Sequence, residues 1–196
     1  TTETLLNEIT DESIPSAARP PFRRMTVEEA FTTHAGIDLT GCQDTDALAD
    51  AARRSGLTPG GDETWADIFH LVMLSLVEPK LPRDRPLALL DYPEQVRCLA
   101  KVKKGTPWRE RWELYIDGVE TANCFSELVD PAAVSTLFSS EAYGETGVAE
   151  RTDPTFADIY SPRHPRCSGV ALGMDRLIMV LTGSESIADI MPFPRS

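Results

Sequence analysis

The chain has 196 residues, 41% of them hydrophobic and 26% charged, and its formal net charge is −12. This length suits one sizeable domain with its own core, and the acidic balance argues against broad binding to the phosphate backbone of nucleic acids. The first residues have neither a basic leader nor a long apolar stretch, and no apolar run is long enough to cross a bilayer, so we expect neither a signal peptide nor a membrane span. The four widely spaced cysteines match no zinc pattern and indicate reduced thiols in a cytoplasmic protein.

The first part of the chain predicts short helices joined by loops. Residues 3–9 have the pattern of a helix end, and the proline-rich stretch 14–22 indicates a linker that also takes in Arg23 and Arg24. Capping residues then predict the starts of three helices, at Thr26, at Asp44 or Thr45, and at Thr64. We therefore assign 1–22 to a helix end and linker, and 23–84 to a helical insert.

The second part, residues 85–196, predicts strands and helices. Short apolar or alternating runs predict strands over 86–92, 109–118, 119–128 and 167–172, with an Asp-Gly hairpin turn between the second and the third. Helices are predicted after Asp130 and over 174–183, and the stretch 144–166 is polar and contains prolines. An antiparallel sheet flanked by helices indicates an α+β fold.

The predicted hairpin gathers acidic side chains. Since residues two apart on a strand share a face, Glu113 and Tyr115 lie on one face before the turn. Beyond the turn, where Glu120 comes first, a second set shares a face: Asn123, Phe125 and Glu127. One interpretation is a cation site for a divalent metal or an amino group, with Phe125 as a wall, because Mg²⁺ prefers carboxylate oxygens. The other is a half-solvated sheet face.

The stretch GVALGMDRLIMVL, residues 169–181, carries Asp175 and Arg176 side by side in an apolar run. At a helix N-terminus Asp175 fits as a cap or partner, whereas Arg176 opposes the helix dipole and suits phosphate binding or stacking on a base. Gly169 and Gly173 allow a flat group to come close to the backbone. Alternatively, the Asp–Arg pair only ties the helix to the strand. The glycine spacing matches neither a Walker loop nor a dinucleotide fingerprint.

Two further groups of residues are assigned structural roles. The basic run KVKKGTPWRERW, residues 101–112, could contact nucleic acid through its lysines, arginines and tryptophans. More often such a run is a mobile surface loop, which is the interpretation we favour. The histidines have no partner at ligand spacing and are interpreted as structural or surface residues: His34, His70 and His164.

Taken together, the hairpin and the Asp-Arg stretch resemble the catalytic domain of class II aminoacyl-tRNA synthetases, in the lysyl branch. GVALGMDRLIM is similar to the third motif of that class, a glycine-rich strand followed by a helix that starts with Asp-Arg. ELYIDGVETANCFSELVDP is similar to the lysine-site hairpin of the lysyl enzymes, and SESIADIMPFP to their C-terminal ending. These matches cover most of residues 86–196.

A closer resemblance is to the elongation factor P lysine ligases, small relatives that act on a protein instead of tRNA. CSGVALG resembles the version of the motif in that family, and residues 26–80 resemble its helical insert. Ala171 stands where lysyl-tRNA synthetases usually have glycine, a change that the family links to a preference for (R)-β-lysine. One methyl group in a tight pocket can shift selectivity by roughly 1–3 kcal/mol.

The resemblance implies ATP and Mg²⁺ as cofactors and a role for each site residue. Glu113 and the backbone of Leu114 would serve ATP and its Mg²⁺, and Glu120 would meet the metal or the amino group of the substrate. Four residues would shape the pocket for lysine or β-lysine: Asn123, Phe125, Glu127 and Ala171.

The resemblance also implies a nucleotide clamp and a two-step reaction. Gly173 would lie against the nucleotide, and Arg176, oriented by Asp175, would reach adenine and the γ-phosphate. The substrate carboxylate would attack the α-phosphate of ATP, and pyrophosphate would leave. A lysine of elongation factor P would then attack the acyl group of the resulting aminoacyl-adenylate.

Two motifs of the family are not found in the sequence: a first motif that forms a dimer and a second that surrounds the α-phosphate. We therefore expect a partial catalytic domain that cannot activate an amino acid alone and whose parent is a homodimer. Two alternatives stay open. One is a catalytic fragment that charges tRNA-Lys, ranked lower because of the acidic charge. The other is a non-catalytic paralogue, which the missing motifs favour and the intact acids, with Arg176, argue against.

Overall fold

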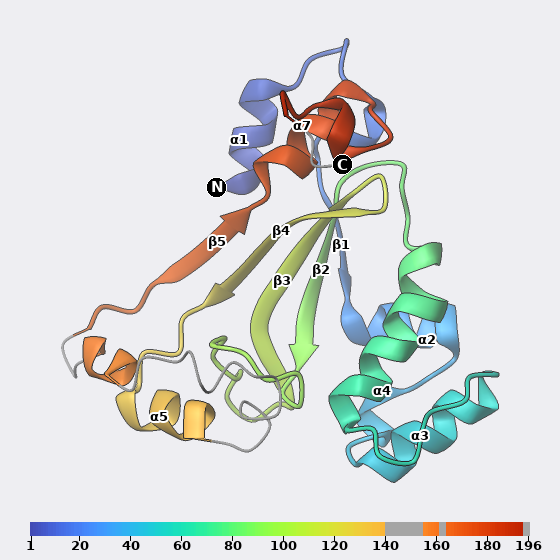
Figure 1. Cartoon of the computed structure of the whole chain (residues 1–196), viewed down its shortest axis with the longest axis vertical. Helices are drawn as coiled ribbons and strands as arrows, with labels where there is room; N and C mark the ends of the chain where they lie inside the picture. The colour runs from blue at the N-terminus through green and yellow to red at the C-terminus, as the bar shows by residue number, and fades with distance from the viewer. Residues whose placement is uncertain (140–154, 161–163, 194–196) are drawn as a thin grey trace.

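The computed structural model describes residues 1–139, 155–160 and 164–193, and a five-stranded sheet lies at its centre (Figure 1). The strands follow chain order across the sheet: β1 (Arg23–Thr26), β2 (Leu87–Pro93), β3 (Trp108–Ile116), β4 (Val119–Ser126) and β5 (Ser168–Leu172). β1 runs parallel to β2, and the other neighbouring pairs are antiparallel. The predicted α+β architecture, a sheet flanked by helices, is therefore confirmed.

The prediction of an antiparallel sheet is wrong at one edge. Arg23 and Arg24 do not lie in a linker, because they form β1 and pair with Leu87 and Ala88. The chain leaves β1, passes through the helices of residues 27–80 and returns as β2. A crossover of this length through helices is what a parallel pair of strands requires. A strand of four residues is too short for its alternation to be detected in the sequence.

The helices of the described residues are short. The α-helices are α1 (Thr2–Ile9), α2 (Val27–Ala35), α3 (Thr45–Arg54), α4 (Trp65–Val72), α5 (Pro131–Ser139) and α7 (Met174–Thr182). A π-helical segment, Met73–Val77, extends α4, and 3₁₀ turns occupy Ser16–Ala18, Leu39–Gly41, Glu78–Lys80, Phe156–Ile159 and Ile187–Asp189. None of these helices is long and apolar enough to cross a membrane. Most of the polar stretch 144–166 lies outside the described residues.

The predicted helix starts are confirmed. Thr26 and Thr64 cap α2 and α4 through capping boxes that Glu29 and Asp67 complete, and Asp44 caps α3. Each cap satisfies backbone N–H groups that have no partner within the first helical turn. The capping side chains therefore determine the residue at which each of these three helices begins.

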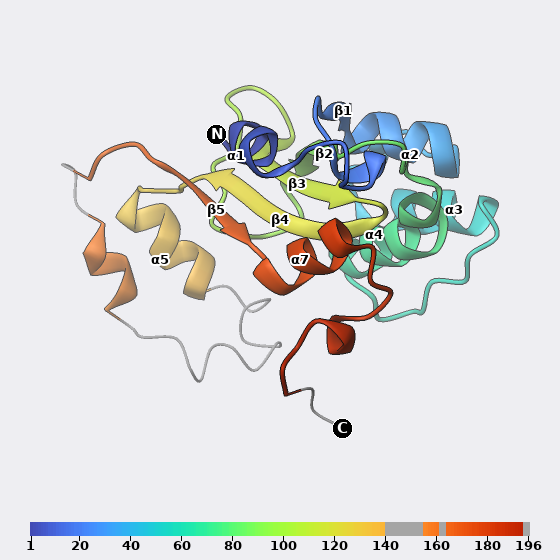
Figure 2. The same cartoon turned by 90° about the horizontal axis from the view of Figure 1, so that it is seen from above.

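Helices cover the sheet through two separate hydrophobic cores. α2, α3 and α4, which Figure 2 shows grouped beside β1 and β2, bury Leu87 and Leu89 together with Tyr115. α1 and α7 contribute to the second core, which contains Ala88 and Leu114. Because side chains alternate along a strand, β2 supplies both cores in turn. We call the face that carries Leu89 and Tyr115 the α4 face, and the candidate site lies on it.

Candidate functional site

The β3–β4 hairpin positions the acidic side chains. Its predicted Asp-Gly turn is confirmed, with φ of 51° and 78° at the two residues, values that this pair adopts readily. Beyond the turn the register shifts: Tyr115 pairs with Glu120, but Leu114 pairs with Ala122, so Thr121 is an extra residue on β4. This β-bulge reverses the alternation on one strand.

The bulge decides which acids share a face. Glu113 pairs with Asn123 across the hairpin, and both lie on the α4 face. Strict alternation from Asn123 would place Glu120 on the opposite face, because the two residues are three apart. With Thr121 as the extra residue, Glu120 joins Glu113 on the α4 face. The predicted convergence of the acids therefore depends on the β-bulge at Thr121.

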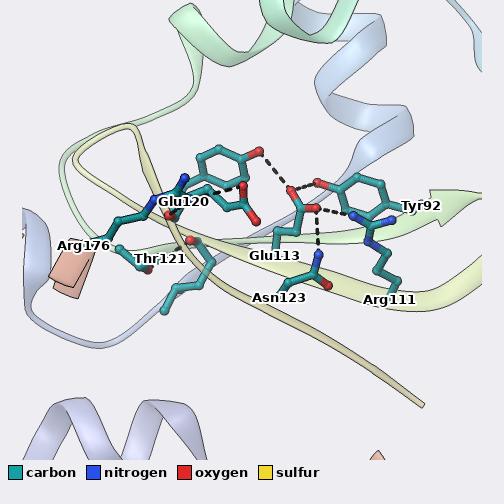
Figure 3. Close-up of polar contacts among 9 residues, drawn as sticks. Tyr92, Arg111, Glu113, Glu120, Thr121, Asn123 and Arg176 are labelled. Atoms are coloured by element: carbon teal, nitrogen blue, oxygen red, sulfur yellow. Dashed lines mark hydrogen bonds and ion pairs between the residues drawn. The ribbon is translucent and has the colours of Figure 1, made fainter. Parts of the chain in front are cut away.

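Glu113 lies at the centre of a buried hydrogen-bond network (Figure 3). Its Oε2 accepts hydrogen bonds from the hydroxyls of Tyr92 and Tyr115, the second at 3.0 Å. Its Oε1 accepts hydrogen bonds from Nη2 of Arg111 at 2.6 Å and from Nδ2 of Asn123 at 3.3 Å. The Arg111 guanidinium also lies over the Tyr92 ring, 4.5 Å from its centroid. This part of the hairpin is therefore a closed network and not a solvated sheet face.

Burial sets the charges in this network. The side chains of Glu113 and Arg111 are only 8% and 15% exposed. Burial, and then the charge of Glu113, raise the pKa of Tyr92 and of Tyr115, so both phenols remain protonated donors at neutral pH. Within this network, two buried atoms have no hydrogen-bond partner among the described residues, Nε of Arg111 and Oδ1 of Asn123. An unpaired buried donor and acceptor mark positions where a polar ligand group would fit.

The interpretation of residues 101–112 as a surface loop is wrong for its second half. Arg109 and Arg111 lie on β3, and Arg109 is 9% exposed and donates hydrogen bonds to three backbone carbonyl groups. Lys103 forms an ion pair with Asp91 of β2. Arg109, Arg111 and Lys103 therefore act within the fold, and Arg111 is a site residue that the sequence analysis missed.

Arg176 extends from the first turn of α7 towards the start of β4 (Figure 3). Its Nη1 donates a hydrogen bond to the backbone oxygen of Glu120 at 2.9 Å and lies 3.6 Å from Oε2 of the same residue. Gly173 is the N-cap of α7, so Asp175 is not the cap. No hydrogen bond or ion pair joins Asp175 to Arg176 within the described residues. The expectation that Asp175 orients Arg176 is therefore wrong, and Glu120 holds the guanidinium.

A cavity of about 390 Å³ lies where β4, β5 and the start of α7 meet. Six of the predicted site residues line it: Glu120, Asn123, Ala171, Gly173, Asp175 and Arg176. Ala171 reaches this cavity because it pairs with Asn123 across β4 and β5. A Cβ added at Gly173 would lie 3.5 Å from the backbone oxygen of Thr121, an ordinary contact. The protein's own packing therefore does not demand a glycine there.

Three other predicted site residues lie away from this cavity. Leu114 is fully buried, and its carbonyl oxygen accepts a hydrogen bond from Oγ1 of Thr121 at 3.1 Å, so its contact with ATP stays a prediction. Phe125 pairs with Gly169 of β5. Glu127, just beyond β4, lines a second cavity of about 540 Å³. The candidate site thus extends along the sheet from Arg176 to Glu127.

The two acids predicted to bind Mg²⁺ differ in availability. Glu120 is 38% exposed and lines the first cavity, so its carboxylate suits a cation that takes its other ligands from phosphates. Glu113 already accepts hydrogen bonds on both oxygens. Among the described residues, no group of three or more metal-binding side chains is spaced to hold an ion. Binding of Mg²⁺ by Glu120 therefore stays a prediction, as does a role for Glu113 as a ligand.

The stability contributed by Glu120 is expected to fall as pH rises. Burial, and then the charge of Glu113, raise the pKa of Glu120 above its ordinary value, although Arg176 opposes the shift. The folded state therefore holds this proton more tightly than the unfolded chain does, so deprotonation above the ordinary carboxyl range favours unfolding. Glu120→Gln should raise stability at pH 7 by less than about 1 kcal/mol, because solvent screens a side chain that is 38% exposed.

Urea unfolding between about pH 4 and pH 7 measures this effect. The matched control is Glu110→Gln, whose carboxylate pairs with Lys101 at 3.8 Å and is 34% exposed. The stability of Glu120→Gln should decline less across this range than that of the unsubstituted protein. Parallel curves for the two would contradict the expectation.

Comparison with known proteins identifies the family. The family described as class II tRNA synthetases (D, K and N) matches residues 1–196. The chain belongs to this family. The likeness therefore extends beyond the strands that carry the recognised motifs and includes α1 and the helices that follow β1.

Several cyanobacterial relatives bear the name lysine–tRNA ligase. The one from Nostoc sp. (strain PCC 7120) is 35% identical over 181 residues, which make up 89% of this chain and 32% of the relative. The one from Nostoc punctiforme is 33% identical over 193 residues, or 95% of this chain and 34% of the relative. The one from Gloeobacter violaceus is 34% identical over 178 residues, which make up 89% of this chain and 35% of the relative. The chain spans about a third of the length of these relatives.

Proposed function

We propose that this chain is part of an enzyme that activates lysine or (R)-β-lysine with ATP. The observation that carries the proposal is a contrast between three acids of one hairpin. Glu113 accepts hydrogen bonds on both oxygens, and Glu120 pairs with Arg176. Glu127 lines a cavity, and its carboxylate makes no hydrogen bond or ion pair within the described residues. The Glu127 carboxylate lies over Gly169 of β5. A carboxylate without a cation partner, in a residue that lines a cavity, is suited to bind an amino group.

In the proposed first step, a carboxylate oxygen of lysine attacks the α-phosphorus of ATP, the bond to pyrophosphate breaks, and an aminoacyl-adenylate forms. Glu127 binds the side-chain amino group, and Arg176 neutralises phosphate charge and lies against the adenine. Bound Mg²⁺ supplies further charge neutralisation, with Glu120 as its accessible ligand. Catalysis then comes from positioning and from charges arranged before the reaction begins.

Two acceptors of the acyl group have support. The names of the relatives favour tRNA-Lys. Ala171 favours a lysine of elongation factor P, because the resemblance links alanine at this position to β-lysine. Cytoplasmic location is proposed on the cysteines, which match no zinc pattern and indicate reduced thiols, and a homodimeric parent on the resemblance.

ATP–pyrophosphate exchange by the complete protein that contains this chain tests the proposal. Exchange should depend on lysine or on (R)-β-lysine and should be absent with norleucine, which lacks the side-chain amino group. No exchange with either lysine isomer would contradict the proposal. Transfer of the labelled amino acid to tRNA-Lys or to elongation factor P then identifies the acceptor.

Ala171→Gly tests the choice of lysine isomer. Removing the methyl group from the wall beside Asn123 enlarges the first cavity. We expect the ratio of kcat/KM values to shift towards α-lysine by roughly 10- to 200-fold, the usual effect of one carbon in a fitted pocket. Ala132→Gly, at an exposed position of α5, is the control for the loss of a methyl group elsewhere. An unchanged ratio would mean that Ala171 does not select between the lysine isomers.

A further inference from the structure

Gly169 lies on β5 directly beneath the carboxylate of Glu127. A Cβ added at Gly169 would lie 2.7 Å from Oε1 of Glu127, closer than real Cβ contacts come. Backbone pairing between β4 and β5 fixes the position of Gly169 relative to Glu127. Gly169 pairs with Phe125 of β4, and the backbone N–H of Glu127 donates to the carbonyl of Cys167 at 3.0 Å. The strand pair thus holds positions 127 and 169 at a set separation.

The backbone itself does not require glycine at position 169. Its φ is not among the positive values in the chain, and an extended strand accepts alanine readily. Within 4 Å of the added Cβ, the neighbours outside the adjacent residues are Oε1 and Cδ of Glu127, at 2.7 and 3.9 Å. Glycine at position 169 therefore leaves room for the Glu127 carboxylate and is not required by the backbone of β5.

We propose that Gly169 is a positioning residue for recognition of the substrate's side-chain amino group, because it leaves the space that the Glu127 carboxylate occupies. This inference rests on the proposed function. Gly169 and Ala171 share one face of β5 and act at different places. Ala171 lies beside Asn123 in the first cavity, whereas Gly169 lies under the carboxylate of Glu127, a residue that lines the second cavity.

A positioning role and a structural role for Gly169 predict different effects of Gly169→Ala. Oε1 is the end of a flexible side chain, so alanine at position 169 turns the carboxylate aside without a backbone shift. Folding should then persist while the geometry for binding the amino group is lost. A residue with a merely structural role would lower stability instead. Stability and the KM for lysine therefore separate the two explanations.

The test uses ATP–pyrophosphate exchange by the complete protein carrying Gly169→Ala. We expect the KM for lysine to rise about tenfold or more, with an unchanged KM for ATP. The melting temperature should match that of Gly61→Ala, a control at a glycine with open space around it and no positive φ. Gly169→Ala combined with Glu127→Gln should lose no more lysine affinity than Glu127→Gln alone, because both changes act through one carboxylate.

Three results would overturn the inference: an unchanged KM for lysine, additive losses in the double variant, or a Gly169→Ala protein that fails to fold. The last would mean that the carboxylate cannot move aside. If the unsubstituted protein showed no exchange with lysine, the proposed function would fail and this inference with it. Exchange by the unsubstituted protein with an unaffected Gly169→Ala variant would remove this inference alone.

Discussion

Glu113→Ala is expected to destabilise the protein by about 3–5 kcal/mol, the usual cost of removing one partner of a buried ion pair. The substitution leaves Arg111 charged with its side chain only 15% exposed. It also removes the acceptor of the Tyr92 and Tyr115 hydroxyls. In a chain of 196 residues the melting temperature should fall by about 10 °C, which calorimetry measures.

Two further variants check the cause. Glu110→Ala removes an acid of the same strand whose partner, Lys101, is 47% exposed, and its cost should be below about 1 kcal/mol. Replacing both members of the buried pair, as Arg111→Met with Glu113→Leu, should recover much of the lost stability, because no uncompensated charge remains. If Glu113→Ala and Glu110→Ala melted at the same temperature, the buried network would not stabilise the fold.

Glu127→Gln is expected to have the largest effect on substrate recognition. The substitution keeps the shape of the side chain but removes the charge that faces the amino group. Loss of one partner from a charged contact costs about 2–4 kcal/mol, so the KM for lysine should rise roughly 30- to 700-fold. The KM for ATP should stay constant, because Arg176 and Glu120 lie at the other cavity.

The matched control for this prediction is Glu110→Gln. Glu110 lines the same cavity as Glu127 but already pairs with Lys101. Steady-state pyrophosphate exchange with varied lysine gives both KM values. Equal changes in the two variants would mean that the cavity attracts lysine through its overall charge and not through one carboxylate.

Regular periodicity made part of the site predictable. Glu113 and Tyr115 share a face, as alternation along β3 requires, and a hydrogen bond joins them. The Asp-Gly pair predicted the turn because few other residues accept positive φ at both positions. The bulge at Thr121 was not predictable, since the register of two strands depends on how they pack. It was nevertheless the bulge that brought Glu120 onto the α4 face.

Long-range pairing explains the residues that the sequence analysis missed. Tyr92 reaches Glu113 because β2 pairs with β3, and no local pattern links residues so far apart. Arg23 and Arg24 were assigned to a linker because a strand of four residues shows no clear alternation by itself. Only its pairing with β2 identifies it as a strand. Arg111 did have a signal: it lies two residues before Glu113 on a predicted strand, so both side chains had to share a face.

The central claim is that the α4 face holds lysine at Glu127 and ATP at Arg176. A crystal structure of the complete protein with lysine and a non-hydrolysable ATP analogue tests it most directly. The side-chain nitrogen of lysine should lie about 3 Å from the Glu127 carboxylate, over Gly169, with the nucleotide against Arg176. Lysine bound with its side-chain amino group away from Glu127, or a nucleotide remote from Arg176, would contradict the account.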